Sequence, residues 1–308
     1  MRAYAKNGMK RACYVCAIRK VMKAMKQKWF AVSFVRHIGA ALLVVLLLTM
    51  TSGAVATGSN AFRIPILMYH HVIVGGAADC NTMTVTVDRL REDLFFLQKQ
   101  GYTALLPRDL VKIRAGEEKM PQKPIMITFD DGYESNYTLA YPLLRASGMK
   151  ATIALLVSKI RAPGQVPTGI PFLTWDECRT MSAGGLVEFG SHTYALHNLD
   201  HAGTPHENGH DGIQRLPQEK QDAYLARVGS DLHTSVMMIY RELGTYCRSF
   251  SYPFGACDPW FDSLLAREGI SVTTTTVQRT ANIWCGTKRL PRLRVTMDTH
   301  LADLLKNQ

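Results

Sequence analysis

The stretch Pro124-Ile125-Met126-Ile127-Thr128-Phe129-Asp130-Asp131-Gly132 runs from a continuously apolar segment directly into two carboxylates and a glycine. A strand without polar alternation is typical of a parallel sheet whose two faces are both covered. Apolar runs of similar length recur along the chain from residue 64 onward. We interpret these runs as further strands over residues 64–70, 102–106, 151–157, 186–192, 249–254, 271–276 and 290–295.

Helical patterns lie between these strands, with apolar residues at intervals of three and four and a glycine at several of their ends. They predict helices over residues 87–100, 135–147, 174–182, 219–243 and 258–268, and the stretch 198–217 predicts a surface loop. Repeated strand–helix alternation predicts an α/β fold. Seven or eight such units in about 240 residues are enough to close a barrel, with an open doubly wound sheet as the alternative. Both architectures place the chemistry at the carboxyl ends of the strands.

The net charge of +11 is concentrated at the start of the chain, because the first 37 residues hold ten Lys and Arg and no acidic residue. The remainder holds 26 basic and 25 acidic residues, so no nucleic-acid-binding surface is predicted. An apolar run over residues 38–48 and the small residues Ala54-Val55-Ala56 follow in the order of a signal peptide. We expect a leader over residues 1–56 that interacts with the membrane or the secretion machinery, either cleaved or retained as an anchor through residues 38–56. Residues 57–308 are then an extracytoplasmic domain, secreted or associated with the cell envelope.

Five cysteines follow the leader, and this odd number leaves at least one free thiol. Cys247 and Cys257 could form a disulfide after export. The sequence alone does not fix this connectivity.

Three of the predicted strands end in polar motifs. Asp130 and Asp131 follow the strand predicted over residues 124–129. His192 ends the strand predicted over residues 186–192, and His197 comes five residues later. Two residues five apart do not share a helix face, so the two histidines converge only if the chain leaves the strand and turns back. Two imidazoles and one carboxylate make a metal site with open positions for water and substrate, which suits Zn²⁺ or a neighbouring divalent ion. The second carboxylate is then left to accept a proton from water.

These motifs resemble those of a known family. Thr128-Phe129-Asp130-Asp131-Gly132, then Ser191-His192-Thr193-Tyr194-Ala195-Leu196-His197, then Tyr252-Pro253-Phe254-Gly255 resemble, in order, the first three motifs of the polysaccharide deacetylases with a NodB homology domain, carbohydrate esterase family four. The resemblance runs from about residue 64 to the C-terminus and implies a deformed (β/α) barrel with seven or eight strands. It also implies metal-dependent removal of acetyl groups from sugars.

The same resemblance implies a role for each motif residue. Asp130 is the general base, and the metal ligands are Asp131, His192 and His197. The backbone N–H of Phe254 helps to bind the oxyanion, and Tyr252 borders the substrate.

One position departs from the family pattern at the third motif. Many members carry an arginine three residues before the aromatic residue of this motif, where it orients the base, but this chain has Ser251. Arg292 or Arg294 is a candidate to supply the charge instead. An exposed basic turn is the alternative interpretation of these two residues.

The general acid is also displaced. Many members carry it in a C-terminal strand, but here His300 opens a predicted last helix and is expected at the surface. Ile66-Leu67-Met68-Tyr69-His70-His71-Val72 resembles instead the opening of the circularly permuted branch, which includes the biofilm poly-N-acetylglucosamine deacetylases. This resemblance implies that His70 protonates the leaving amine, and strand alternation sends His71 to the opposite face.

The predicted function is hydrolysis of N-acetyl groups on an extracytoplasmic N-acetylglucosamine-containing polysaccharide, either an exopolysaccharide or peptidoglycan. An O-acetyl carbohydrate esterase with the same site is the nearest alternative, and a non-catalytic sugar-binding barrel is another. Retention of Asp130 favours catalysis over mere binding, because a binding protein needs no base beside the metal. The absence of a Gly-x-Ser-x-Gly motif disfavours a serine esterase.

Overall fold

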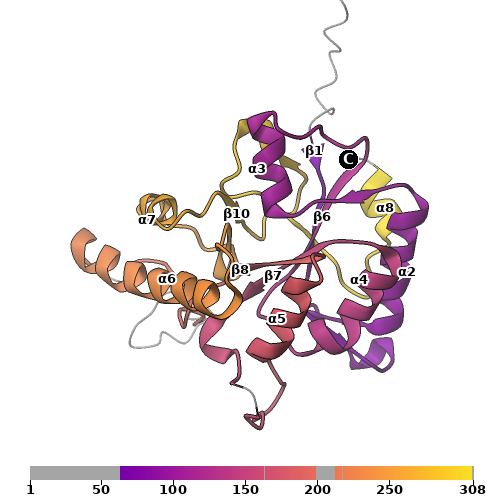
Figure 1. Cartoon of the computed structure of the whole chain (residues 1–308), viewed down its shortest axis with the longest axis horizontal. Coiled ribbons are helices and arrows are strands. Elements are labelled where there is room, and N and C mark those ends of the chain that lie inside the picture. The colour runs from indigo at the N-terminus through magenta and orange to yellow at the C-terminus, as the bar shows by residue number, and fades with distance from the viewer. Residues whose placement is uncertain (1–62, 163, 199–211, 217, 307–308) are drawn as a thin grey trace, which may run out of the picture. The chain divides into compact units, whose positions relative to one another are not determined.

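A curled parallel sheet forms the centre of the computed structural model (Figure 1). The structure describes residues 63–162, 164–198, 212–216 and 218–306. The predicted leader, the domain boundary near residue 56 and most of the predicted loop over 198–217 lie outside these residues. Among the residues that are described, no helix is long and apolar enough to cross a membrane.

The strand order of the sheet is β10-β9-β8-β7-β6-β2-β12, and every neighbouring pair is parallel. β5 (Thr103–Ala104) pairs with the start of β6. The seven strands of the main path are β2 (Ile66–Tyr69), β6 (Pro124–Phe129), β7 (Ala151–Leu155), β8 (Val187–Ser191), β9 (Ser249–Ser251), β10 (Val272–Thr274) and β12 (Leu293–Arg294). The predicted α/β class and all eight predicted strands are therefore confirmed, most of them with shorter bounds.

One segment near the C-terminus connects the two edges of this sheet. Leu290 forms a parallel bridge with Thr274 of β10. Three residues later, Leu293 pairs with Leu67 of β2. The segment 290–294, which includes the edge strand β12, thus pairs with β2 on one side and is bridged to the other edge strand, β10, so the two edges of the curled sheet come together.

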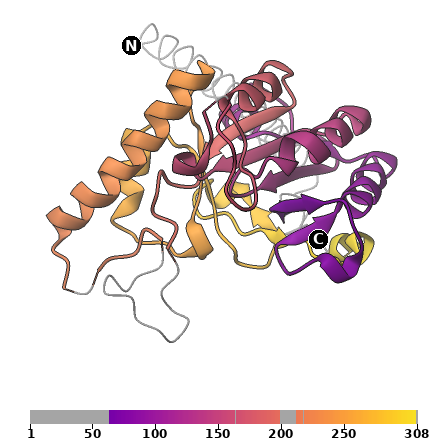
Figure 2. The same cartoon turned by 90° about the horizontal axis from the view of Figure 1, so that it is seen from below.

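Helices cover the outside of the sheet (Figure 1). Their bounds are α2 (Val87–Lys99), α3 (Pro107–Ala115), α4 (Tyr141–Ser147), α5 (Trp175–Ala183), α6 (Gln221–Leu243), α7 (Phe261–Arg267) and α8 (Leu301–Lys306). Figures 1 and 2 show α2 beside α8 at one end of the molecule and α6 at the other. The prediction missed α3, and the predicted helix over 135–147 is divided into a π-helix, η2 (Asn136–Ala140), and α4.

Shorter elements surround this framework. Two small sheets are formed by β1 (Arg63–Ile64) with β11 (Ala281–Asn282), and by β3 (His71–Ile73) with β4 (Thr84–Thr86). The 3₁₀ turns are η1 (Ala77–Asp79), η3 (Val157–Lys159), η4 (Pro253–Gly255) and η5 (Ile283–Cys285).

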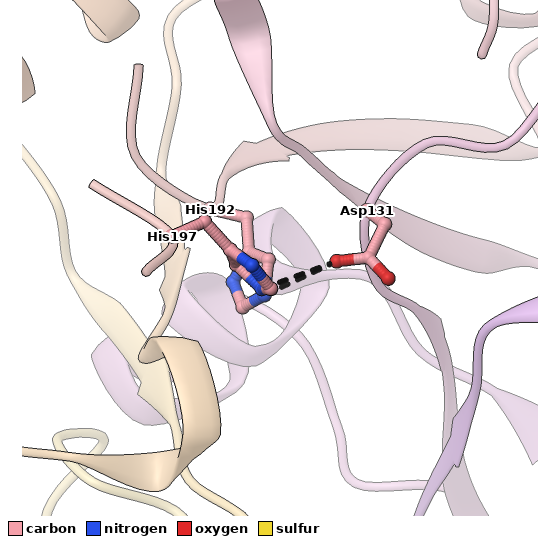
Figure 3. Close-up of side chains that lie close together, drawn as sticks. All are labelled: Asp131, His192 and His197. Carbon is pink, nitrogen blue, oxygen red and sulfur yellow. Dashed lines mark ion pairs between the residues drawn. The ribbon is translucent and has the colours of Figure 1, made fainter. Parts of the chain in front are cut away.

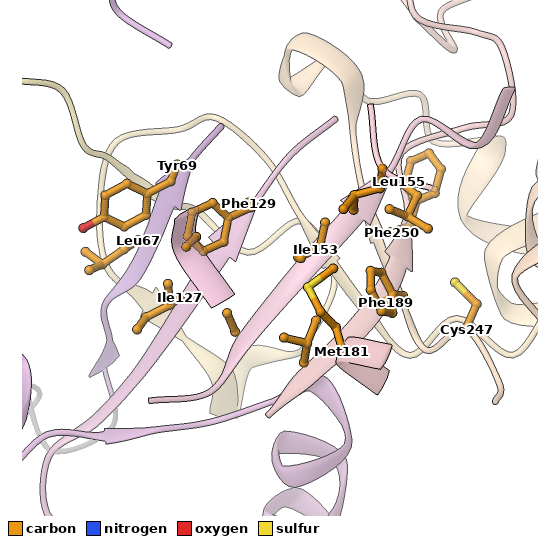
Figure 4. Packing of buried hydrophobic residues seen from close by; sticks show 14 of the residues in the cluster. Leu67, Tyr69, Ile127, Phe129, Ile153, Leu155, Met181, Phe189, Cys247 and Phe250 are labelled. Atoms are coloured by element: carbon orange, nitrogen blue, oxygen red, sulfur yellow. The ribbon is translucent and has the colours of Figure 1, made fainter. Parts of the chain in front are cut away.

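Strand alternation divides the core into two layers. Odd-numbered residues of β6, Ile127 and Phe129 among them, pack beneath the helices in one large cluster (Figure 4). Met126 faces the other side, in a second apolar cluster that includes Ile66 and Val272. Toward the carboxyl ends of the strands, the residues on this second side become polar and culminate in Asp130. The barrel interior therefore has an apolar floor and a polar upper end, where the predicted site lies.

The cysteines of the described residues are all free thiols. Cys247 Sγ donates a hydrogen bond to the carbonyl of Ser249, and Cys257 Sγ donates one to that of Gly255. The disulfide considered for Cys247 and Cys257 is not formed.

Candidate active site

The two adjacent aspartates follow β6 on a strained turn. Asp131 and Gly132 both have positive φ angles, 71° and 81°. The φ angle of Gly132 favours glycine, and a Cβ atom there would also lie 2.8 Å from Leu155 Cδ2. Asp131, a non-glycine residue in the left-handed region, costs energy that the surrounding fold must offset, which is common at functional sites. The turn places the two carboxylates against different partners.

Asp131 lies against the two histidines of the second motif (Figure 3). Its Oδ1 is 3.5 Å from His192 Nε2 and 3.4 Å from His197 Nε2. We call these three residues the Asp–His–His triad. The structure thus brings together all three residues that the resemblance implies as metal ligands.

The triad fits a divalent metal ion. Asp131 Oδ1 is buried and has no hydrogen-bond partner among the described residues, so it is available as a ligand. The ligand atoms of the three residues all lie within 4.8 Å of one another. Two ligands of a tetrahedral Zn²⁺ ion, each about 2.1 Å from the metal, are about 3.4 Å apart. The two measured Asp–His separations match that spacing.

A backbone carbonyl fixes the orientation of His192. The ring Nδ1 lies 2.7 Å from the carbonyl oxygen of Ser251, and because a carbonyl only accepts, Nδ1 must carry the proton. Nε2 therefore presents its lone pair toward Asp131, the arrangement by which metal-binding histidines are usually oriented. Burial lowers the pKa of both His192 and His197, so both rings are neutral and able to bind a cation.

Asp231 of α6 holds the turn that brings His197 back to the site. Its two carboxylate oxygens accept hydrogen bonds from the backbone N–H groups of Tyr194 and Ala195, each at 2.8 Å. The His197 ring also packs on Phe254, with ring centroids 4.6 Å apart. The sequence analysis did not identify Asp231. Its partners lie 37 and 36 residues away along the chain, so no local sequence signal marks it.

Arg292 is the partner of Asp130. Its Nη1 and Nη2 donate to the two oxygens of Asp130 at 2.8 and 2.6 Å, and its side chain is fully buried. Further hydrogen bonds run from the guanidinium to Thr128 Oγ1 and to the carbonyl of Thr275. Burial alone would raise the pKa of Asp130, but Arg292 and His192 hold that pKa well below its usual range. Asp130 is therefore ionised.

The structure distinguishes between the two candidate arginines. Arg292 makes the bidentate contact and does not form an exposed basic turn. Arg294, two residues further on, is partly exposed, and its backbone N–H donates to Gln278 Oε1.

His70, and not His71, faces the site. His70 Nε2 lies 3.9 Å from Asp130 Oδ2, and the side chain is almost entirely buried. Burial lowers the pKa of His70 to about 4, so the ring is neutral at neutral pH in the metal-free chain. His71 points the other way and packs against Tyr133, with ring centroids 5.0 Å apart. His300 is exposed just before α8.

Of the two residues predicted from the third motif, Phe254 contacts the triad and the hydroxyl of Tyr252 does not. Phe254 has a left-handed backbone, with φ of 56°, and its ring contacts His197. The Tyr252 ring is buried between Phe250 and Phe261. Its hydroxyl donates to Asp262 at 2.9 Å, so the structure does not bring this hydroxyl to the triad.

Comparison with known proteins gives concordant results. The family model described as polysaccharide deacetylase matches residues 117–273, just over half of the chain. The chain is 33% identical over 135 residues to the poly-β-1,6-N-acetyl-D-glucosamine N-deacetylase of Escherichia coli K12. This match covers 41% of the chain and 20% of that enzyme, so the chain spans about a fifth of the length of this relative.

Two solved structures are similar over most of the chain. The de-N-acetylase of Aggregatibacter actinomycetemcomitans has a TM-score of 0.69 and 26% identity, covering 79% of this chain and all of that one. The BpsB deacetylase domain of Bordetella bronchiseptica has a TM-score of 0.62 and 28% identity, covering 76% of this chain and 96% of that one. The curled parallel sheet matches the deformed barrel of these neighbours. With the family model, the motif residues and the fold in agreement, the chain belongs to the polysaccharide deacetylase family.

Proposed function

We propose that the chain is a metal-dependent hydrolase that removes N-acetyl groups from an extracytoplasmic polysaccharide containing N-acetylglucosamine. The observation that carries this proposal is the separation of the two adjacent aspartates. Asp130 is paired with a buried arginine, whereas Asp131 faces two neutral histidines. One carboxylate is thus free of the metal and the other is available to it, as hydrolysis by an activated water requires.

The Asp–His–His triad would hold the ion. When bound, a divalent ion supplies a Lewis acid for the acyl oxygen and lowers the pKa of a water molecule. The chain itself provides three ligands, which leaves coordination positions open, as in catalytic zinc sites.

Asp130 is suited to receive the proton of the attacking water. Although Arg292 donates to both of its oxygens, each carboxylate oxygen keeps a further lone pair. Asp130 Oδ2 lies 3.9 Å from Nε2 of the neutral His70, which can accept a proton from it when the two groups close to hydrogen-bonding distance. His70 can then donate this proton to the amine as the C–N bond breaks. The hydroxyl of the water ends in acetic acid and its other proton on the sugar amine, so the step balances, and the acid then ionises to acetate.

The names of the relatives support a substrate class. The Escherichia coli relative is named for poly-β-1,6-N-acetyl-D-glucosamine, and we propose this type of exopolysaccharide as the first candidate and peptidoglycan as the second. The basic and apolar pattern of residues 1–56 supports export, so we also propose that residues 57–308 act outside the cytoplasm.

The test is acetate release by the full chain loaded with Zn²⁺. Substrates are β-1,6- and β-1,4-linked N-acetylglucosamine oligomers, peptidoglycan and an O-acetylated xylan, with free amine measured beside acetate. We expect equal amounts of acetate and amine from an N-acetylated substrate. Acetate from the xylan alone would instead favour an O-acetyl esterase, and binding without acetate would favour a sugar-binding barrel.

The matched control is Asp130→Asn. This variant should keep the metal and lose activity by roughly 10²-fold or more, the usual scale for a positioned general base. Normal turnover by Asp130→Asn would show that the base lies elsewhere.

A further inference from the structure

His70 lies at a break between two hydrogen-bonded ladders. β2 pairs with β6 as far as Tyr69, which is level with Phe129. From His71 onward the chain pairs with β4 instead, beginning at Thr84. The Tyr69 carbonyl still accepts from the Asp130 N–H and the His71 N–H still donates to the Met83 carbonyl, but the carbonyl of His70 itself must find its partner outside the two ladders.

Two side chains from one short segment provide those contacts. Asn136 Nδ2 donates a hydrogen bond to the carbonyl of His70 at 2.9 Å. Ser135 Oγ accepts one from the backbone N–H of Val72 at 3.1 Å. Both side chains are buried, Asn136 completely. The peptide groups on either side of His71 are thus held by two neighbouring side chains.

The same segment begins with the proposed base. From Asp130 the left-handed turn at Asp131 and Gly132 reverses the chain, and Ser135 and Asn136 follow within six residues. Asn136 is the first residue of the π-helix η2, a rare conformation that is frequent at functional sites. Segment 130–136 therefore contains Asp130 and also forms hydrogen bonds with the backbone at and just after His70.

We propose that Ser135 and Asn136 are positioning residues that hold His70 beside Asp130 for proton delivery to the leaving amine. The inference rests on the proposed function, with His70 as the acid. Its basis is geometric. Nε2 of His70 is already 3.9 Å from Asp130 Oδ2, and a longer separation would prevent proton transfer between them. A displacement of about 1 Å in a reacting group can cost as much as ~10²-fold in rate.

The test compares two substrates that differ in their need for an acid. Ser135→Ala, Asn136→Leu and the double variant are assayed, as the Zn²⁺-loaded full chain, on an N-acetylglucosamine oligomer and on 4-nitrophenyl acetate, whose leaving group needs little protonation. The double variant should lose roughly 10- to 100-fold in kcat on the amide and less than about 3-fold on the ester. Metal content should not change.

Ser147→Ala is the matched control. Its side chain is also buried, but among the described residues its hydroxyl bonds to the carbonyls of Leu143 and Leu144 within its own helix, so both activities should persist. A second arm repeats the substitutions in a His70→Ala background. There they should change the amide rate by less than about 2-fold, because a group that acts through His70 has nothing left to position.

The outcomes separate the two proposals. Failure of the wild type to release acetate from any amide would refute the proposed function, and with it this inference. An active wild type whose variants lose amide and ester turnover in parallel, or lose neither, would overturn the positioning role alone. Full additivity with His70→Ala would do the same. If Asn136→Leu does not fold, Ser135→Ala alone carries the comparison.

Discussion

Replacing Arg292 by leucine should destabilise the fold and abolish activity together. The guanidinium is fully buried and forms a bidentate pair with Asp130, so its removal leaves a buried carboxylate without a counter-charge. Breaking a buried pair in this way typically costs about 3–5 kcal/mol of unfolding free energy. For a domain of this size, that loss corresponds to a fall of roughly 6–20 °C in Tm.

The pH dependence of this loss follows from the direction of the pKa of Asp130. In the wild type that pKa lies below its unfolded value, so the carboxylate contributes stability above about pH 4 and loses it on further acidification. Without Arg292, the largest influence that lowers this pKa is lost while burial still raises it, so we expect the pKa to rise and the variant to gain stability relative to the wild type as pH falls. The stability deficit of Arg292→Leu should therefore be largest near pH 7 and shrink toward pH 4.

Urea unfolding of the metal-free proteins at several pH values measures these effects. Arg294→Leu is the matched control and should stay within about 1 kcal/mol of the wild type, because that side chain is partly exposed. The double variant Asp130→Asn/Arg292→Leu, which has no buried charge at this position, should recover part of the loss. A deficit below about 1 kcal/mol for Arg292→Leu, or one that does not vary with pH, would refute the reasoning.

Three further predictions concern the metal and the histidines. Alanine at any position of the Asp–His–His triad should remove bound metal and activity together, whereas the exposed His300→Ala should remove neither; full metal occupancy in all three triad variants would eliminate the ligand set. Asp231→Ala should weaken Zn²⁺ affinity by roughly 10- to 100-fold in calorimetric titration, because the turn before His197 loses its carboxylate; unchanged affinity would show that the turn holds without it. Burial lowers the pKa of His70 to about 4, below its unfolded value of about 6.5. The free energy of unfolding should therefore be constant above about pH 6.5 and fall by up to about 3 kcal/mol as pH drops toward 4, because only the unfolded chain binds the proton there. His70→Gln in the metal-free chain should lose less stability over that range than the wild type, and equal losses would contradict the assignment.

The strands that carry the site could be predicted because their signal is local. β6, β7 and β8 are buried on both faces, so β6 and β7 are apolar apart from one threonine each, and β6 and β8 end directly in the polar residues of the site. Elements of three residues, such as β3 and β4, carry no such run, and contacts with distant residues place them, including their pairing with each other and the hydrogen bond from Val72 to Ser135. α3 could have been found, since Pro107 at its start and Gly116 after its end are standard helix boundary signals.

The residues that support the site have no comparable local signal. Asp231 contacts a turn 37 residues away, and Ser135 and Asn136 contact residues 63 and 66 positions away. Each is an ordinary polar residue in a helical pattern, and its role depends on which backbone groups the fold leaves without partners. That information exists only after the strands are placed, so these residues had to come from the structure.

The choice between Arg292 and Arg294 shows what barrel closure adds to the sequence pattern. The two residues are two apart, so strand alternation assigns them to the same face and cannot separate them. Arg292 lies between Leu290, which pairs with β10, and Leu293, which pairs with β2, and its guanidinium contacts both Thr275 and Asp130 across that seam. The segment that brings the two edges of the sheet together therefore also supplies the counter-charge of the proposed base.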